Sequence, residues 1–120
     1  MIRELTEQEV HFDVECLEES MHPRDCMESG DTEMDKADAA EILRRLETNP
    51  WAWCTVKVTA SWGGYRASDY LGGCSYDSER DFTSGDSDYF ADMKASALAG
   101  LNAKLRAEHE KLEALRVKAP

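Results

Sequence analysis

Three histidines are the side chains that could most directly carry acid–base or metal chemistry in this 120-residue chain: His11, His22 and His109. His11 lies two residues before Asp13, so both side chains would share one face of a strand, where the imidazole could act as a base. The sequence places no nucleophile beside this pair, and His109 lies between two glutamates in a polar segment. We therefore expect no catalytic residues and a protein that is not an enzyme.

Metal-binding motifs are also missing from the sequence. His22 and Cys26 are four residues apart but have no second pair to complete a site, and the four cysteines show no CxxC spacing. The carboxylates between residues 77 and 92 lack the order of ligands that defines a calcium loop. We expect neither a metal nor a cofactor.

Two glycine pairs, Gly63-Gly64 and Gly72-Gly73, resemble phosphate-binding loops only at first sight. No helix begins directly after either pair, and neither belongs to a GxGxxG or GxxxxGK pattern. A hairpin turn at the first pair and a strand bulge at the second explain them more simply. The second pair could also mark a place where a partner approaches the strand closely.

The net charge of −11 is unevenly distributed along the chain. Residues 1–48 hold 15 acidic and 5 basic side chains, whereas residues 49–120 hold 10 and 9. Such a field repels nucleic acid and anionic membranes and attracts basic protein surfaces. Two interpretations follow: the acidity only keeps the protein soluble, or an acidic surface competes with nucleic acid for a basic groove.

Composition and length indicate a folded protein of one domain. Hydrophobic residues make up 42% of the chain and charged residues 32%, as in globular proteins. No apolar run is long enough to cross a membrane, and the N-terminus lacks the apolar core of a secretory signal. We expect a single domain over residues 1–120 in the cytoplasm, where the four cysteines stay reduced.

The alternation of hydrophobic and polar residues predicts an α+β fold in the order β-α-β-β-α. Residues 9–16 alternate as a half-buried strand, and residues 32–48 repeat apolar positions with helical spacing. Two strand-like runs flank the glycine turn at 51–62 and 65–76, and an acidic loop follows. A long helix from about 86 to 116 completes a three-stranded antiparallel sheet with helices mainly on one face.

A two-residue turn at Gly63-Gly64 would pair Trp62 with Tyr65 and, further along, Lys57 with Tyr70. Extended to the strand ends, this register places four aromatic residues on the face opposite the core. They are Trp51, Trp53, Tyr70 and Tyr76. Exposed, they would form a protein-binding patch; covered by a helix, they would be part of the core.

The last helix is long enough to extend beyond its sheet, because some thirty residues span about 45 Å while a strand of twelve residues spans at most about 40 Å. Its leucines fit the a and d places of a heptad, interrupted by Glu108. This pattern makes a homodimer possible through Leu101, Leu105, Leu112 and Leu115.

The stretch from Trp51 to Tyr65, continuing from Asp69 to Tyr76, resembles small uncharacterised proteins of tailed phages and prophages. The resemblance covers the hairpin and parts of the first strand and transfers no functional motif. It implies a phage accessory protein in the host cytoplasm, a class that includes anti-CRISPR and anti-restriction inhibitors.

Together these features predict an inhibitor that binds a host protein or ribonucleoprotein complex with a basic surface. We expect that the inhibitor itself binds neither nucleic acid nor membrane. The acidic residues expected to make this contact are Glu33, Asp38, Glu41, Asp77, Glu79, Asp81, Asp86 and Asp88. The alternative is a homodimeric phage structural or assembly protein that uses the last helix and the aromatic face of the hairpin.

Overall fold

The computed structural model describes residues 2–23, 33–84 and 89–117 and confirms the α+β class. Three strands form one antiparallel sheet in the order β1-β2-β3: His11–Leu17, Cys54–Trp62 and Tyr65–Cys74. Three α-helices accompany it: α1 (Glu33–Leu46), α2 (Glu79–Ser84) and α3 (Tyr89–Ala114). Short 3₁₀ turns, η1 (Glu7–Glu9) and η3 (Pro50–Ala52), precede β1 and β2. The prediction of a loop over residues 77–85 was wrong for the part that forms α2.

The turn between β2 and β3 has the two-residue form that the glycine pair predicts. Gly63 and Gly64 have φ values of 56° and 83°, which glycine adopts at little cost. Trp62 pairs with Tyr65, and Lys57 pairs with Tyr70. The register is therefore confirmed from the turn as far as the pairing of Val56 with Leu71.

A bulge shifts the register beyond that pair. Cys54 pairs with Cys74, so Gly72 and Gly73 together lie opposite the single residue Thr55, and Gly73 has a φ of 64°. The bulge at this glycine pair is confirmed. Extending the register to the strand ends pairs Trp53 with Cys74 and Trp51 with Tyr76. The first of these pairings was wrong, because the extra residue lets Cys74 pair with Cys54. Trp51 and Tyr76 lie outside the strands and are joined by a hydrogen bond from the Tyr76 N–H to the Trp51 carbonyl at 2.8 Å.

The core lies between one face of the sheet and α3. Val56, Val58 and Ala60 of β2 are fully buried there, and Ala97 and Leu101 of α3 pack on the same side. Small residues let the helix lie close to the sheet: a Cβ added at Gly100 would lie 3.2 Å from the Cβ of Ala67. Helix and strands share one hydrophobic layer, as a two-layer α+β structure requires.

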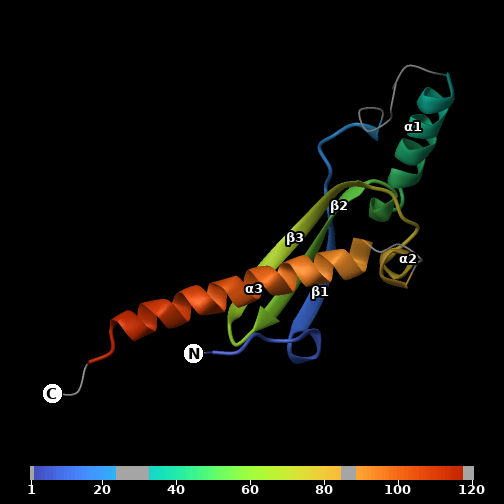
Figure 1. Cartoon of the computed structure of the whole chain (residues 1–120). Helices are drawn as coiled ribbons and strands as arrows, with labels where there is room; N and C mark the ends of the chain where they lie inside the picture. The colour runs from blue at the N-terminus through green and yellow to red at the C-terminus, as the bar shows by residue number, and fades with distance from the viewer. Residues whose placement is uncertain (1, 24–32, 85–88, 118–120) are drawn as a thin grey trace.

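The helices occupy different places around the sheet (Figure 1). Helix α3 runs across one face and continues past the hairpin turn, which confirms the predicted overhang and contributes to principal dimensions of 77 × 25 × 22 Å. Helix α1 lies at the opposite end and contacts η3. The expectation of helices mainly on one face of the sheet is thus correct for α3, whereas α1 lies beyond the end of the sheet.

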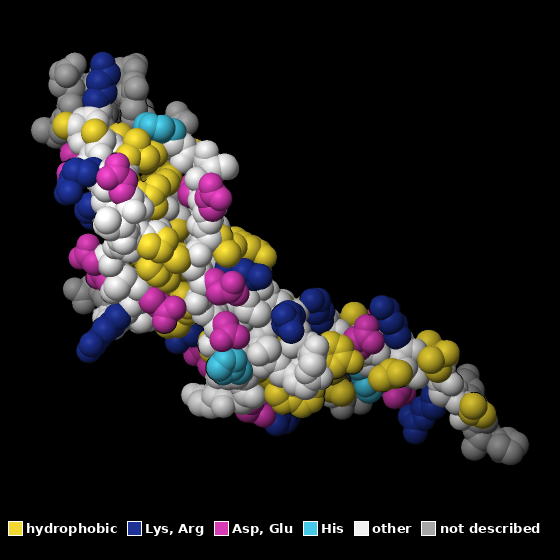
Figure 2. Space-filling model, turned by 180° about the vertical axis from the view of Figure 1, so that it is seen from behind, with side chains coloured by type: hydrophobic (Ala, Val, Ile, Leu, Met, Phe, Trp, Pro, Cys, Tyr) yellow, Lys and Arg dark blue, Asp and Glu magenta, His cyan; other side chains and the backbone are white. Residues whose placement is uncertain are grey.

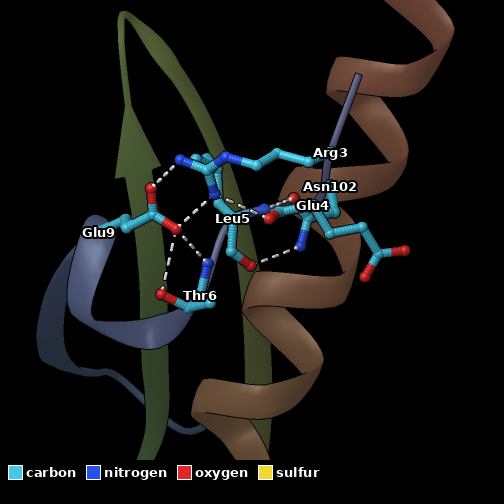
Figure 3. Close-up of polar contacts among 6 residues, drawn as sticks. All are labelled: Arg3, Glu4, Leu5, Thr6, Glu9 and Asn102. Atoms are coloured by element: carbon cyan, nitrogen blue, oxygen red, sulfur yellow. Dashed lines mark hydrogen bonds and ion pairs between the residues drawn. The ribbon is translucent and has the colours of Figure 1, made fainter. Parts of the chain in front are cut away.

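The N-terminal segment is held against α3 by one buried amide (Figure 3). The side chain of Asn102 accepts a hydrogen bond from the Leu5 N–H (2.9 Å) and donates one to the Leu5 carbonyl (3.1 Å). Arg106 adds an ion pair with Glu4 at 2.8 Å. Since Asn102 and Leu5 are 97 positions apart, these bonds join the two ends of the described chain.

Replacing Asn102 by alanine should release this segment. The Leu5 N–H and carbonyl would lose their partners in a half-buried place, so the free energy of unfolding should fall by about 1–3 kcal/mol. Urea unfolding measures this loss, and the Leu5 amide should exchange its hydrogen faster. Ser96→Ala, an exposed change on the same helix, is the control. Unchanged exchange at Leu5 would contradict the assignment.

Candidate interaction surfaces

Helices α1 and α2, which both carry acidic residues, lie at the same end of the molecule (Figure 1). The Asn49 side chain, just after α1, donates a hydrogen bond to the carbonyl of Asp77 at 2.9 Å. The Arg45 guanidinium lies 3.8 Å from the Asp77 carboxylate. These contacts connect two segments that are far apart in sequence, so their carboxylates belong to one surface, which we call the acidic end.

The carboxylates of this end differ in how free they are. Asp38 and Glu79 are exposed, whereas Glu41 pairs with Arg44 at 2.5 Å, and this hydrogen bond lowers the pKa of Glu41. Asp81 accepts a hydrogen bond from the Asp77 N–H at 3.0 Å. The side chain of Glu33 and all of Asp86 and Asp88 lie outside the described residues.

The four predicted aromatic residues do not form one exposed patch. Trp51 and Tyr76 pack on the buried ring of Phe82, with ring centroids 6.0 and 5.0 Å away, so they belong to the core side. Trp53 is buried and donates its indole N–H to the Met21 carbonyl at 2.7 Å. Tyr70 alone of the four is exposed, at 56%. The bulge turns Tyr76 to the core side, Trp51 lies in η3 before β2 begins, and Trp53 bonds to the segment that holds Met21. Of the two alternatives, the core therefore applies to Trp51, Trp53 and Tyr76, and exposure to Tyr70.

The sheet instead presents a polar face on the side away from α3. Three residues lie side by side in each row across β1, β2 and β3, as in the row of Glu15, Lys57 and Tyr70. The Lys57 ammonium lies 5.8 Å from the centre of the Tyr70 ring. Asp13 and Glu15 are exposed on β1, so this face carries acidic side chains that the predicted site omitted. The alternation of these two residues with apolar ones already indicated that their side chains face solvent.

Glu19 has a structural role that the sequence analysis did not identify. Its carboxylate accepts hydrogen bonds from the Thr55 hydroxyl (2.6 Å), the Gly73 N–H (2.8 Å) and the Met21 N–H (3.1 Å), and these bonds lower its pKa. A Cβ at Gly72 would come within 3.0 Å of the same carboxylate. The close approach expected at the glycine pair is therefore made by Glu19 of the chain itself.

The side chains that could carry chemistry differ in their exposure. His11 Nε2 is 3.0 Å from the Asp13 carboxylate, but both side chains are mostly exposed, so water screens the pair. Burial, with the nearby Cys74 and Cys16, raises the pKa of the Cys54 thiol to about 12. Burial also raises the pKa of Cys74. Within the described ranges, no cluster of three His, Cys, Asp or Glu residues could hold a metal ion.

The leucines predicted for dimerisation divide into two groups. Leu101 is fully buried against the sheet, so its assignment to an interface was wrong. Leu105 is half-buried beside Tyr65, while Leu112 and Leu115 are 63% and 77% exposed. The more N-terminal turns of α3 therefore pack their apolar side chains in the core, whereas the end of the helix leaves its apolar side chains exposed.

Comparison with known proteins finds no matching family model, no matching curated protein and no matching solved structure. In the part of the chain covered by the structure, none of the helices combines the length and apolarity needed to cross a bilayer.

Glu19→Ala should destabilise the protein by about 1–2 kcal/mol, because three hydrogen-bond donors lose a charged acceptor. Since folding lowers the pKa of Glu19, this contribution is present at neutral pH and is lost as pH falls below about 4.5. Urea unfolding at pH 7 and pH 3 should show a smaller difference from wild type at pH 3. Glu18→Ala, the exposed neighbour, should change little, and equal losses would refute the role of Glu19.

Cys54 should resist alkylation in the native protein. A pKa of about 12, against 9.0 for a free thiol, lowers its thiolate fraction about a thousandfold. Iodoacetamide labelling at pH 8, mapped by mass spectrometry, should modify Cys54 at the rate of unfolding and the half-buried Cys16 sooner. Because folding raises the pKa of Cys54, its contribution to stability is lost as pH rises from about 9 towards 12. Fast native labelling of Cys54 would contradict the burial.

Proposed function

We propose that this protein acts by binding, without turnover, and that its acidic end engages a basic surface on another macromolecule. The observation that carries the proposal is that the end of α1 is joined to the segment that leads into α2 by the contacts of Asp77 with Arg45 and Asn49. Both helices carry exposed carboxylates. Figure 2 supports it, because acidic side chains are spread over the sheet part of the face it shows. Asp13 and Glu15 lie on this polar sheet face.

The mechanism is competition. A basic groove that binds phosphates also attracts carboxylates, and a rigid acidic surface that occupies it excludes nucleic acid by charge and by volume. The phage resemblance suggests the target: a nucleic-acid-dependent host defence complex, inhibited in the manner of anti-CRISPR proteins. Such binding should weaken steeply as salt increases, because screening acts on every charge pair at the exposed surface.

Charge reversal tests the acidic end. Asp38→Lys and Glu79→Lys replace exposed carboxylates, so each should weaken binding about fivefold at low salt and reduce the salt dependence. The target is first captured from host lysate with the tagged wild-type chain and identified by mass spectrometry. Affinity is then measured by titration at several salt concentrations, with and without competing DNA.

Glu110→Lys is the matched control, since it makes the same charge change at an exposed position near the other end of the molecule. It should leave the affinity within twofold of wild type. Binding that is independent of salt, or that leaves nucleic acid bound to the target, would overturn the proposal.

A further inference from the structure

Helix α3 carries its sheet-facing side past the end of the sheet. Beyond Lys104, whose ammonium donates to the Arg66 carbonyl at 2.6 Å, the helix passes the hairpin turn and projects from the body. We call residues 104–117 the arm. Its exposed apolar side chains include Leu112 in the last helical turn and Leu115 just after it, and these continue the stripe that Leu101 and Leu105 begin on the sheet. The arm is therefore an amphipathic helix end without a covering layer among the described residues.

A groove lies where the arm meets the body. Trp62 at the hairpin turn (46% exposed) and Ile2 (39% exposed) line it together with leucines of the N-terminal segment and the arm. Arg3, Glu108 and His109 add polar side chains to the same lining. An apolar centre with polar side chains around it has the composition of a protein interface.

The charges beside the apolar stripe indicate what fits this groove. With Leu105 and Leu112 at heptad position a, the flanking g positions are Lys104 and Lys111. The flanking e position within α3, which ends at Ala114, is His109. None of the three is acidic, although the chain carries a net charge of −11.

Such flanks disfavour a second copy. An antiparallel pair of arms would place Lys104 beside Lys111 of the second copy, and a parallel pair would place Glu108 beside its Glu108, so both arrangements bring like charges together. A helix with acidic residues beside its apolar stripe would instead find an opposite charge at Lys104 and Lys111.

We propose that the arm and the groove at its base bind an acidic amphipathic helix of a partner protein. The helical part of the arm, residues 104–114, spans about 16 Å, so it offers about three turns of contact. Leu105, Leu112 and Trp62 supply the apolar anchors, and Lys104 and Lys111 select the acidic flanks. Glu108 occupies a d position and pairs with Lys111 at 3.5 Å, so a lysine in the facing part of the partner helix would share this carboxylate and fix the register.

This inference concerns a surface at the other end of the molecule from the acidic end and does not rest on the proposed function. Figure 2 shows Lys and Arg side chains along the projecting arm, beside apolar ones. The arm has four basic and three acidic residues, whereas residues 2–23 have one and seven. An acidic partner is thus attracted to the arm and repelled by much of the body.

The test uses a fluorescent synthetic helix with leucines at a and d, glutamates at e and g, and one lysine placed to face Glu108. Its affinity for the full chain is compared with that of a matched peptide carrying lysines at e and g. We expect the acidic peptide to bind at least tenfold more tightly at low salt. Lys111→Glu should weaken its binding about fivefold and strengthen that of the basic peptide. Leu112→Ser should weaken both about tenfold.

Two controls make the same chemical changes away from the groove: Arg80→Glu on α2 and Leu43→Ser on α1. Both should leave peptide binding unchanged, and circular dichroism checks that every variant is folded. Equal affinity for the two peptides, or no binding up to about 1 mM, would overturn the proposal. Sedimentation that shows a dimer abolished by Leu112→Ser would also overturn it, since the occupant would then be a second copy.

Discussion

The close contact between α3 and the sheet at Gly100 and Ala67 is the constraint on which the other features depend. Because a Cβ at Gly100 would lie only 3.2 Å from that of Ala67, the helix lies near the strands there and buries Ala60, Ala97 and Leu101 around it. A contact this tight fixes the line along which the helix crosses the sheet. With one face covered by α3, the other face is polar, and the rest of the helix must project beyond the hairpin turn.

The projecting helix needs support at its base, and the N-terminal segment provides it. Asn102 comes two residues after the close contact at Gly100 and binds the backbone of Leu5 as a neighbouring strand would. Leu5 then packs with Leu105 on the same cluster. Arg3 pairs with Glu9 at 2.5 Å and, with the backbone N–H of Thr6, lowers the pKa of Glu9 to about 2. The segment is thus ordered by polar contacts along its length.

Local patterns predicted the parts of this fold that depend on neighbouring residues. Gly63-Gly64 predicted the turn and register, and strict alternation predicted β1. The bulge at Gly72-Gly73 was recognised, but its effect on Tyr76 was not: one extra residue in β3 turns every later side chain of that strand to the other face. Six-residue α2 is too short to show a period, and the Glu19 and Asn102 contacts join residues 36 to 97 positions apart, for which a single sequence carries no signal.

The separation of charge along the molecule has a structural origin in these same contacts. The acidic side chains lie on β1, at one edge of the sheet, and at the acidic end. The arm projects beyond the sheet, and its sequence mixes lysine and arginine with glutamate. With a longest dimension of 77 Å and a Debye length of about 8 Å at physiological salt, the arm and the acidic end do not influence each other electrostatically. Each can therefore select a partner of opposite charge independently. A chain that binds a basic surface at one end and an acidic helix at the other would bring two proteins together, and the rigid α3 would set the distance between them.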